Sequence, residues 1–422
     1  MQWLSEALWS TGDYRRAEEV LRDLEERARA AADLGMEWRA KIGQAWVLVN
    51  TTNATFDEIV GPAHRAIQIF SRLGDEWGLA KTWGLLARAH FNAGRAGEAQ
   101  KANARAAVHA RSAGDASEEM MRFVGLASDA TFGPAPVEEA LGWCREILER
   151  VKGQPGKEAA FDVCRGLLEA MRGNFDTART AMIHARSLLR DLGNTFRLAG
   201  MTNDAADVEW YAGDIHAEER ERRSGYEAFG RMGAWGFRAT SAAWLARTLV
   251  ELGRNDEALK LTRESEELAG EDDISAQVPW RGARAKILAR RGAHEEAERI
   301  AREGVAIAER TDWLNLRGDA RMDLAEVLRL MGRDDESRQN IQLASSSSSR
   351  RATASWRPGH ARSSSSFRYE RLEPSSRRRP LHSGNGALRR KCVVHPILDM
   401  QLPGGRSDLL EDGADELCRG VW

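Results

Sequence analysis

Residues 242–261 read AAWLARTLVELGRNDEALKL, and this stretch indicates two short helices joined by a tight turn. Leu245, Leu249 and Leu252 follow the i, i+4, i+7 spacing that places apolar side chains along one face of a helix. Gly253 follows at once, and glycine can end a helix because it adopts the left-handed conformation without a Cβ clash. The stretch therefore predicts a helical hairpin.

The same pattern recurs along the chain. Residues 5–21 read SEALWSTGDYRRAEEVL and residues 85–102 read LLARAHFNAGRAGEAQKA. The turn glycines of the series are Gly12, Gly94, Gly173, Gly213, Gly253, Gly292 and Gly332, separated by 82, 79, 40, 40, 39 and 40 residues. Five are followed five residues later by an alanine, which we expect where the paired helices cross: Ala17, Ala99, Ala178, Ala258 and Ala297. Weaker units near Asn53 and Gly133 complete a series of nine.

This period predicts the fold class. A single hairpin cannot bury both of its faces, so consecutive hairpins must stack. We expect an all-α, right-handed superhelical solenoid of about nine hairpins over residues 1–344, with Asp or Asn after the turns capping the second helices.

The repeat resembles the tetratricopeptide repeat. Trp83, Leu86, Ala87, Gly94 and Ala99 match its pattern in part, as does a second set formed by Leu4, Leu8, Gly12, Tyr14 and Ala17. The period of about 40 exceeds the usual 34 and resembles longer-helix variants from large bacterial signalling ATPases.

Residues 276–333 carry a narrower resemblance, which extends more weakly back towards Met1. They look like the C-terminal repeats of bacterial regulators that join an adenylate/guanylate cyclase or a LuxR-type module to a STAND/AAA ATPase. The resemblance implies a protein-protein interaction scaffold or sensor without catalysis of its own, whose partner is a protein, a peptide or the ATPase or cyclase domains of a parent system. The alternative is a truncated regulatory fragment whose catalytic domains are missing.

After Leu343 the helical pattern gives way to ASSSSSRRATASWRPGHARSSSSF at residues 344–367. Low hydrophobicity with Ser, Arg and Pro enrichment predicts a low-complexity, disordered tail at 345–422. We also hypothesise a frameshift near residue 344, since a neighbouring frame of such a serine run encodes a Leu-Glu-rich helix. Loss of the ninth unit's second helix would expose Leu328 and Leu330.

Composition and charge narrow the function classes. The tail has 14 Lys and Arg against 8 Asp and Glu, which leaves the region before it at about −8, so no specific nucleic-acid footprint is expected there. Four cysteines without a C-x-x-C pair suit a reducing compartment. The start of the chain lacks a leader pattern and no stretch suits a membrane span, so the prediction is a cytoplasmic protein without a membrane partner.

No motif predicts catalysis, a metal or a cofactor. Gly153-Gln-Pro-Gly156-Lys157 lacks the full phosphate-loop spacing, so an interhelical turn is favoured. His294-Glu295-Glu296-Ala297-Glu298 lacks the second histidine of a zinc-protease helix and is typical of a solvated first turn. The nine histidines are scattered, with none placed to share a metal with a cysteine.

Partner binding is predicted on the concave side, where the first helices of successive units would lie. By repeat register, the candidates are Arg247, Arg281, Lys286 and Glu326. Asp319 and Asp323 lie one turn apart and face in principle the set Arg281, Arg284 and Lys286; interhelical ion pairs are favoured there over a clamp for an anionic ligand.

Overall fold

A computed structural model describes residues 4–5, 8, 13–51 and 54–351. They belong to a first compact unit, Met1–Phe367, while a second unit, Arg368–Trp422, lies outside the described residues. In the described ranges all regular structure is helical. The helices are α2 (Tyr14–Ala30), α3 (Leu34–Thr51), α4 (Phe56–Leu73), α5 (Glu76–Asn92), α6 (Ala96–Ser112), α7 (Ala116–Phe132), α8 (Val137–Val151), α9 (Pro155–Arg172), α10 (Phe175–Asp191), α11 (Thr195–Ala212), α12 (Ile215–Met232), α13 (Trp235–Glu251), α14 (Asn255–Leu268), α15 (Ile274–Arg290), α16 (His294–Glu309), α17 (Leu314–Leu330) and α18 (Asp334–Arg351).

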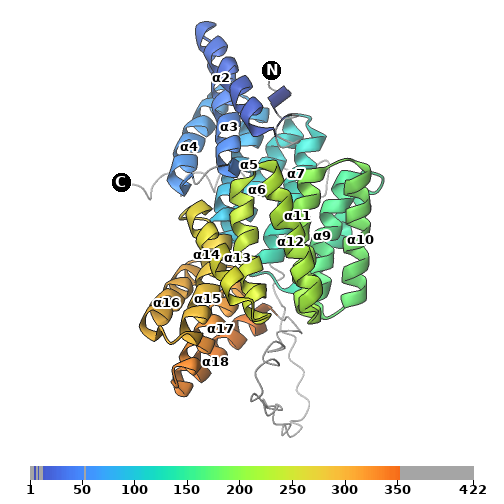
Figure 1. The fold of residues 1–422 in the computed structure, drawn as a ribbon. Coiled ribbons are helices and arrows are strands. Elements are labelled where there is room, and N and C mark those ends of the chain that lie inside the picture. The colour runs from blue at the N-terminus through green and yellow to red at the C-terminus, as the bar shows by residue number, and fades with distance from the viewer. Residues whose placement is uncertain (1–3, 6–7, 9–12, 52–53, 352–422) are drawn as a thin grey trace, which may run out of the picture. The chain divides into compact units, whose positions relative to one another are not determined.

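These helices confirm the predicted solenoid. Helix α2 is the second helix of the first unit, and eight pairs follow, from α3 with α4 to α17 with α18 (Figure 1). Within a unit the two helices pack as a hairpin, and first helices also contact first helices of neighbouring units, as α13 contacts α15 and α15 contacts α17. This continuous stacking buries the face that a lone hairpin would expose.

The turns show why glycine recurs at this period. Gly94, Gly173, Gly213, Gly253, Gly292 and Gly332 all have φ between 67° and 94°, the left-handed region. Gly133 differs, because it ends α7 in an extended conformation with φ −74°. Gly12 and Asn53 lie outside the described residues.

Helix capping follows the prediction at some turns only. The Asp214 carboxylate accepts a hydrogen bond of 2.9 Å from the backbone N–H of Ala217 at the start of α12. Helices α6, α14 and α16 follow Arg95, Arg254 and Ala293, and none of these three makes a side-chain capping bond.

The small residues of the second helices are fully enclosed. Each alanine of the predicted set, Ala17, Ala99, Ala178, Ala258 and Ala297, has no exposed surface. On α13 the facing stripe is equally buried at Leu245 and Leu249. A larger side chain at the alanine positions would therefore have to push the paired helices apart.

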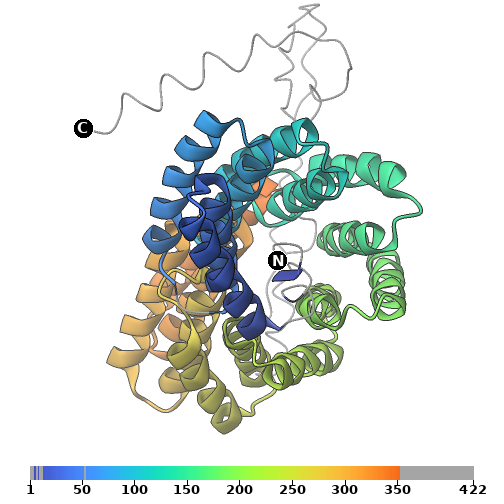
Figure 2. The ribbon, with the colours of Figure 1, turned by 90° about the horizontal axis from the view of Figure 1, so that it is seen from above.

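The helices wind around a central axis, so that segments far apart in sequence meet (Figure 2). The backbone N–H of Phe56 donates to the Asp272 carboxylate at 2.9 Å, and the N–H of Ala96 donates to Asp312 at 2.8 Å, each across 216 residues. This separation is about five and a half units of ~40 residues, which is one superhelical turn of the chain. Asp312 thus supplies from the next turn the cap that Arg95 does not give to α6.

The end of the solenoid differs from the sequence prediction. Helix α18 continues beyond residue 344 to Arg351, through the serine run. It packs on α17, so that Leu328 is fully buried and Leu330 is partly buried; the expected exposure of these two leucines was wrong. The remainder of the predicted tail, 352–422, with the frameshift hypothesis for it, lies outside the described residues.

Candidate functional site

An internal cavity of about 740 Å³ lies on the inner side of the superhelix. Its walls come mainly from the first helices α3, α5 and α7, with the N-terminal ends of α9, α11 and α13 opposite. Small residues such as Ser117 and Ser128 also line this wall, and Gly84 leaves room for the guanidinium of Arg122. A volume of this size lies in the range of sites that enclose small molecules or short peptide segments.

Aromatic side chains form much of the apolar lining: Tyr14, Trp46, Phe70, Trp77, Phe91, Phe196 and Phe237. On one side Phe196 packs edge-on against Tyr14 and Phe237, with ring centroids 6.1 Å and 5.0 Å apart. Rings of this kind supply large contact area at little cost in conformational entropy.

The polar lining is predominantly basic, with six basic side chains, Arg39, Lys81, Arg88, Arg122, Lys157 and Arg197, against two acidic ones, Glu118 and Asp129. Ion pairs neutralise three of the six. Arg39 holds Asp75 through two hydrogen bonds of 2.6 and 2.7 Å. Lys81 and Arg122 share Glu118, at 2.8 and 3.0 Å. Burial opposes ionisation of Glu118, yet its two cationic neighbours hold its pKa below the usual value.

Arg88 and Arg197 differ from these three, because neither has a carboxylate partner among the described residues. Arg88 lies on α5, 5.7 Å from the centroid of Phe237, and its Nε is buried without a hydrogen-bond partner. Arg197, at the start of α11, donates to the sulfur of Met121 at 3.2 Å. Burial lowers the pKa of both guanidinium groups.

The sequence prediction missed Arg88, although its register was available. Arg88, Arg247, Lys286 and Glu326 each stand six residues before a turn glycine. This position faces the inner side of the solenoid. The sequence prediction named the residues at this position in the later units only. What separates Arg88 from Arg247 and Lys286 is that it forms no ion pair with a carboxylate of the described residues, which depends on how distant units meet.

Asp129 is the second acid of the cavity, and it is buried beside an amide. Asn103 donates to its carboxylate at 2.8 Å. Burial raises the pKa of Asp129 to about 8, although the Asn103 hydrogen bond and the nearby Arg122 and Arg88 favour the charged form; Asp312 adds to the increase.

This pKa gives a testable pH dependence. Because the native state binds the Asp129 proton more tightly than the unfolded chain does, its contribution to stability is complete below about pH 4 and is lost as the pH rises towards 8. Asp129→Asn has no proton to lose at this position, so its stability does not fall with rising pH in this way. The difference in melting temperature, variant minus wild type, should therefore be larger at pH 8 than at pH 5. Thermal melts at the two pH values measure the difference, and an equal shift at both would contradict it.

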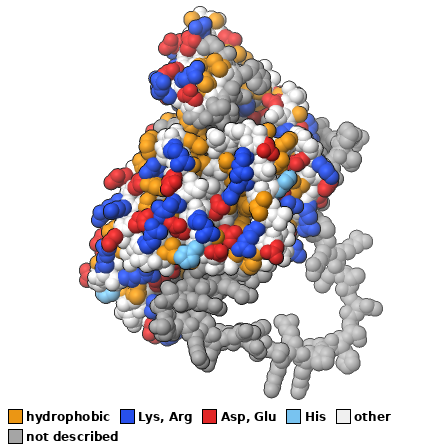
Figure 3. Space-filling model, turned by 45° about the vertical axis from the view of Figure 1, so that its right-hand side comes forward, with side chains coloured by type: hydrophobic (Ala, Val, Ile, Leu, Met, Phe, Trp, Pro, Cys, Tyr) orange, Lys and Arg blue, Asp and Glu red, His pale blue; other side chains and the backbone are white. Residues whose placement is uncertain are grey.

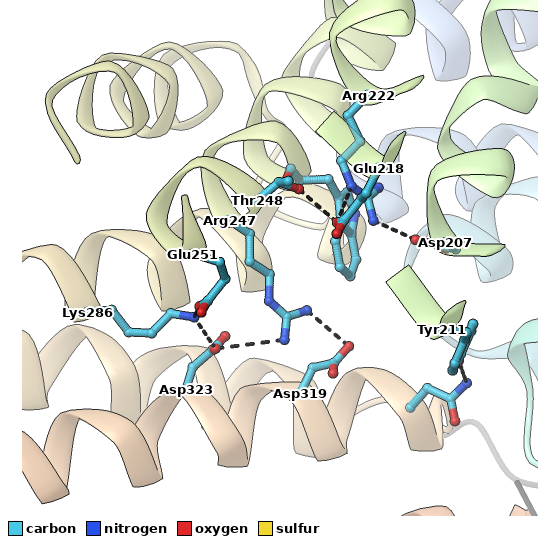
Figure 4. A network of polar contacts seen from close by, with 12 residues as sticks. Asp207, Tyr211, Glu218, Arg222, Arg247, Thr248, Glu251, Lys286, Asp319 and Asp323 are labelled. Carbon is cyan, nitrogen blue, oxygen red and sulfur yellow. Dashed lines mark hydrogen bonds and ion pairs between the residues drawn. The ribbon is translucent and has the colours of Figure 1, made fainter. Parts of the chain in front are cut away.

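The predicted candidates Arg247 and Lys286 lie in a different region, an interhelical charge network (Figure 4), to which Glu326 belongs through Lys286. Arg247 reaches Asp319 at 3.1 Å and Asp323 at 3.8 Å. Lys286 contacts Asp323 at 3.1 Å and Glu326 at 3.8 Å, and also pairs with Glu251 at 2.8 Å.

Every charge of this network has an opposite charge beside it. Burial lowers the pKa of Arg247 and Lys286, but their acidic neighbours outweigh that effect and raise both. The favoured interhelical ion pairs are therefore present at Asp319 and Asp323, though their partners are Arg247 and Lys286 and not Arg281 or Arg284. Partner binding by the predicted residues stays a prediction.

Arg281 lies apart from this network. Its guanidinium stacks on Trp280 at 4.1 Å, donates to the carbonyl of Gln277 at 3.0 Å and stands 3.7 Å from Glu303. The four predicted residues thus do not converge on one site.

A second part of the network, around Arg222 on α12, is fully enclosed. Arg222 pairs with Glu218 at 2.9 Å and with Asp207 at 2.7 Å, and it lies 5.0 Å from the ring centroid of Trp244. Thr248 also donates to Glu218 at 2.8 Å (Figure 4). Glu218 is thus satisfied from its own helix α12 and from α13, while Arg222 links it to Asp207 on α11; we interpret this group as structural.

The sequence motifs that resemble catalytic ones lie in turns and helix ends of the repeats. Gly153 and Lys157 flank the turn between α8 and α9, with Pro155 in the first turn of α9. His294 begins α16. Cys144 and Cys164 are buried and unbridged. Within the described part of the chain, no group of three or more His, Cys, Asp or Glu side chains could hold a metal, and no helix is both long and apolar enough to span a membrane.

The outer face visible in Figure 3 mixes acidic and basic side chains throughout. Exposed pairs along a single helix, such as Arg15 with Glu19 and Arg299 with Glu303, occur in the described part of the chain. Exposed pairs of this kind contribute little to stability. This face offers no continuous basic stripe of the kind that follows a nucleic-acid backbone.

Comparison with known proteins agrees with this geometry. A tetratricopeptide-repeat family model matches residues 3–23 and 239–264. The chain carries a tetratricopeptide repeat region. No curated protein matches the sequence. Its fold is similar to that of a Rap protein solved in complex with competence and sporulation factor, with 12% identity, a TM-score of 0.60, and coverage of 83% of this chain and 98% of that one.

Two further solved structures are similar to a lesser degree. The apo quorum sensor NprR from B. thuringiensis shares 11% identity, with a TM-score of 0.46 and coverage of 82% of this chain and 97% of that one. A STAND protein with a tetratricopeptide repeat sensor, from Pyrococcus horikoshii, shares 14% identity, with a TM-score of 0.40 and coverage of 81% and 52%. At these identities the likeness concerns the fold alone.

Proposed function

We propose that this chain is a non-catalytic sensor or scaffold that binds a peptide segment, free or part of a partner protein, in the cavity on the inner side of its repeats. The observation that carries the proposal is the lining of this cavity, which combines seven aromatic rings with basic groups that the chain itself does not all neutralise. Aromatic and arginine side chains in an enclosed site are the usual anchors of protein recognition. The similar fold of a Rap protein that was solved with a bound factor supports the proposal.

The geometry favours a peptide over a small cofactor. The lining residues run over three consecutive first helices and three helix ends, so an occupant would meet apolar and polar groups in alternation along its length. Repeat solenoids bind extended segments in this way, on a concave surface whose shape the stacking of units fixes.

Occlusion of the cavity tests this function. Ser128→Trp and, nearer the start of α7, Ser117→Trp each add an indole to the lining, whereas Ser187→Trp adds one to an exposed position of α10. We expect a pool of synthetic peptides incubated with the full chain to yield binders that Ser187→Trp retains. Both cavity variants should weaken the same binders by about tenfold or more, or 1.4 kcal/mol. Melting curves verify folding, and equal binding by the folded cavity variants would contradict the proposal.

We further propose, from the resemblance of residues 276–333, that the system served is a bacterial cytoplasmic regulator in which such repeats restrain an ATPase or a cyclase. An upstream reading frame that encodes a phosphate-binding loop and continues into Met1 would support this parent type. An intergenic promoter there would oppose it.

A further inference from the structure

The cavity contains positive charge that the chain does not balance. Glu118 is shared by two cations, and Asp129, with a pKa near 8, is largely protonated at neutral pH. Arg88 and Arg197 remain without a carboxylate among the described residues. Residues 1–344 as a whole carry the opposite sign, at about −8, so this concentration of positive charge does not follow from overall composition.

In the absence of a ligand, the charge of Arg88 in the cavity lowers the stability of the folded protein. Arg88 is partly buried, and a guanidinium that loses part of its hydration without a paired counter-charge is destabilising. Asp273 and Asp129 act on Arg88 only through longer-range attraction, which does not offset the effect of burial on its pKa. The buried Nε has no hydrogen-bond partner. Positions of this kind, where a group is destabilising in the free protein, are typical of binding sites.

A neutral hydrogen-bond donor and an apolar surface lie beside Arg88. Burial raises the pKa of Tyr14 to about 12, so its hydroxyl keeps its proton at neutral pH. Tyr14 is close enough to Arg88 for the two to interact electrostatically. Phe196 and Phe237 close the same region with rings that contact each other. A guanidinium and a phenol would thus meet an anionic oxygen next to a pocket for an apolar side chain.

Arg197 extends this arrangement along the cavity. It follows Phe196 on α11 and its guanidinium reaches towards α7, where the only hydrogen bond of this side chain among the described residues is to the thioether of Met121. A thioether is a weak acceptor, so the guanidinium retains donors for a stronger one.

Building on the proposed function, we propose that the occupant of this cavity is an acidic peptide, whose carboxylate groups bind Arg88 and Arg197 in place of the counter-ions that the chain lacks, while an apolar side chain of the peptide packs against Phe196 and Phe237. Each carboxylate is either the peptide C-terminus or an Asp or Glu side chain. A cavity with so many aromatic and apolar lining residues favours a peptide over a nucleic acid, whose phosphates need a continuous basic surface.

The test uses the full chain and synthetic hexapeptide pools in four arms. Pools with free or amidated C-termini, each with Asp and Glu present or replaced by Asn and Gln, are retained on the protein and identified by mass spectrometry. We expect retention of acidic peptides. If retention fails for the amidated pools, the bound carboxylate is the peptide C-terminus. If it fails for the pools with Asn and Gln, the bound carboxylate is an Asp or Glu side chain.

Substitution of the arginines gives the second readout. Arg88→Met and Arg197→Met should each weaken the retained peptides by about tenfold or more, the loss expected for a charge-assisted hydrogen bond. Arg190→Met, at an exposed position of α10, should leave them unchanged. Without peptide, Arg88→Met should raise the melting temperature, because it replaces an unneutralised buried charge with an apolar side chain.

The outcomes separate the two proposals. Retention of neutral and acidic peptides alike, with no loss in Arg88→Met, would overturn carboxylate recognition and leave peptide binding intact. Retention of no peptide by the wild type would overturn both. A lower melting temperature for Arg88→Met would assign the guanidinium a structural role, and preferential retention of a single-stranded oligonucleotide added in competition would replace the peptide with another class of ligand.

Discussion

Arg222→Met is expected to lower the free energy of unfolding of the central repeats by about 3–5 kcal/mol, because it removes one member of a buried ionic group and leaves the others unpaired. Arg222 is 2% exposed and satisfies Glu218 and Asp207, both of which then remain beside an apolar side chain. Burial already raises the pKa of Asp207 in the intact protein, and the loss of the neighbouring guanidinium should raise it further. The variant should therefore be less destabilised at acidic pH, where Asp207 can take up a proton.

The control for Arg222→Met lies on the same helix. Arg231 is largely exposed and stands 4.0 Å from Glu227, so Arg231→Met should change stability little. Hydrogen exchange of the amides in α11, α12 and α13 is the suitable measurement, since a repeat protein need not unfold in one step. Equal exchange in the two variants would show that the Arg222 group contributes no more than a surface pair. The double variant Arg222→Met with Glu218→Gln should recover part of the loss.

The fold could be predicted from local chemistry. Each hairpin needs a residue that tolerates the left-handed conformation at its turn and a small residue where its helices cross, and both requirements act within about 20 residues of sequence. Gly253 and Ala258 meet them five residues apart in one hairpin, and the repetition of that pair at a fixed period predicts stacking. The end of the last helix escaped the prediction because serines 345–349 lack an apolar stripe, yet α18 includes them.

The candidate site was less predictable, for a physical reason. The sequence register identified the inner position that Arg247 and Lys286 share with Arg88. Whether a charge at that position is free depends on the acids that the superhelix brings beside it. Asp319 and Asp323 lie about 70 residues beyond Arg247, and no local rule assigns them as its partners. The absence of such partners beside Arg88 is likewise a property of the folded chain alone.

Contacts between successive superhelical turns were also outside the reach of the sequence pattern. Asp272 and Asp312 look like ordinary acidic residues of interhelical loops. In the structure the carboxylate of each accepts a hydrogen bond from the backbone N–H at the start of a helix that begins 216 residues earlier, at Phe56 and at Ala96 respectively. Their 40-residue separation equals that of the two helices they cap, so the closure of the superhelix repeats with the period of the units.

Gly94→Ala tests this closure and should have an effect well beyond that of the same substitution at other turns. Gly94 has φ 67°, which costs any other residue about 1–2 kcal/mol. A Cβ there would also lie 2.6 Å from Cγ2 of Thr311 and 2.9 Å from Cδ1 of Ile274, both from the next superhelical turn. Relief of such overlap costs about a further 1–3 kcal/mol, and the backbone bond from Asp312 N–H to the Gly94 carbonyl, 2.9 Å long, would be strained with it.

Gly253→Ala is the matched control, since Gly253 has φ 75° with no atom within 4 Å of the added Cβ. Both variants carry the conformational cost of a non-glycine residue at positive φ. Only Gly94→Ala pushes the two successive superhelical turns apart. We therefore expect faster hydrogen exchange at the amides of Ala96, Gly97 and Asp312 in Gly94→Ala than in Gly253→Ala, because these three amides form the closing bonds. Asp312→Ala should expose the first two in the same way. If all three variants left this exchange as it is in the wild type, the contact between the turns would not hold the superhelix together. The cavity wall at Phe91 and Asp129 would then keep its shape without that contact.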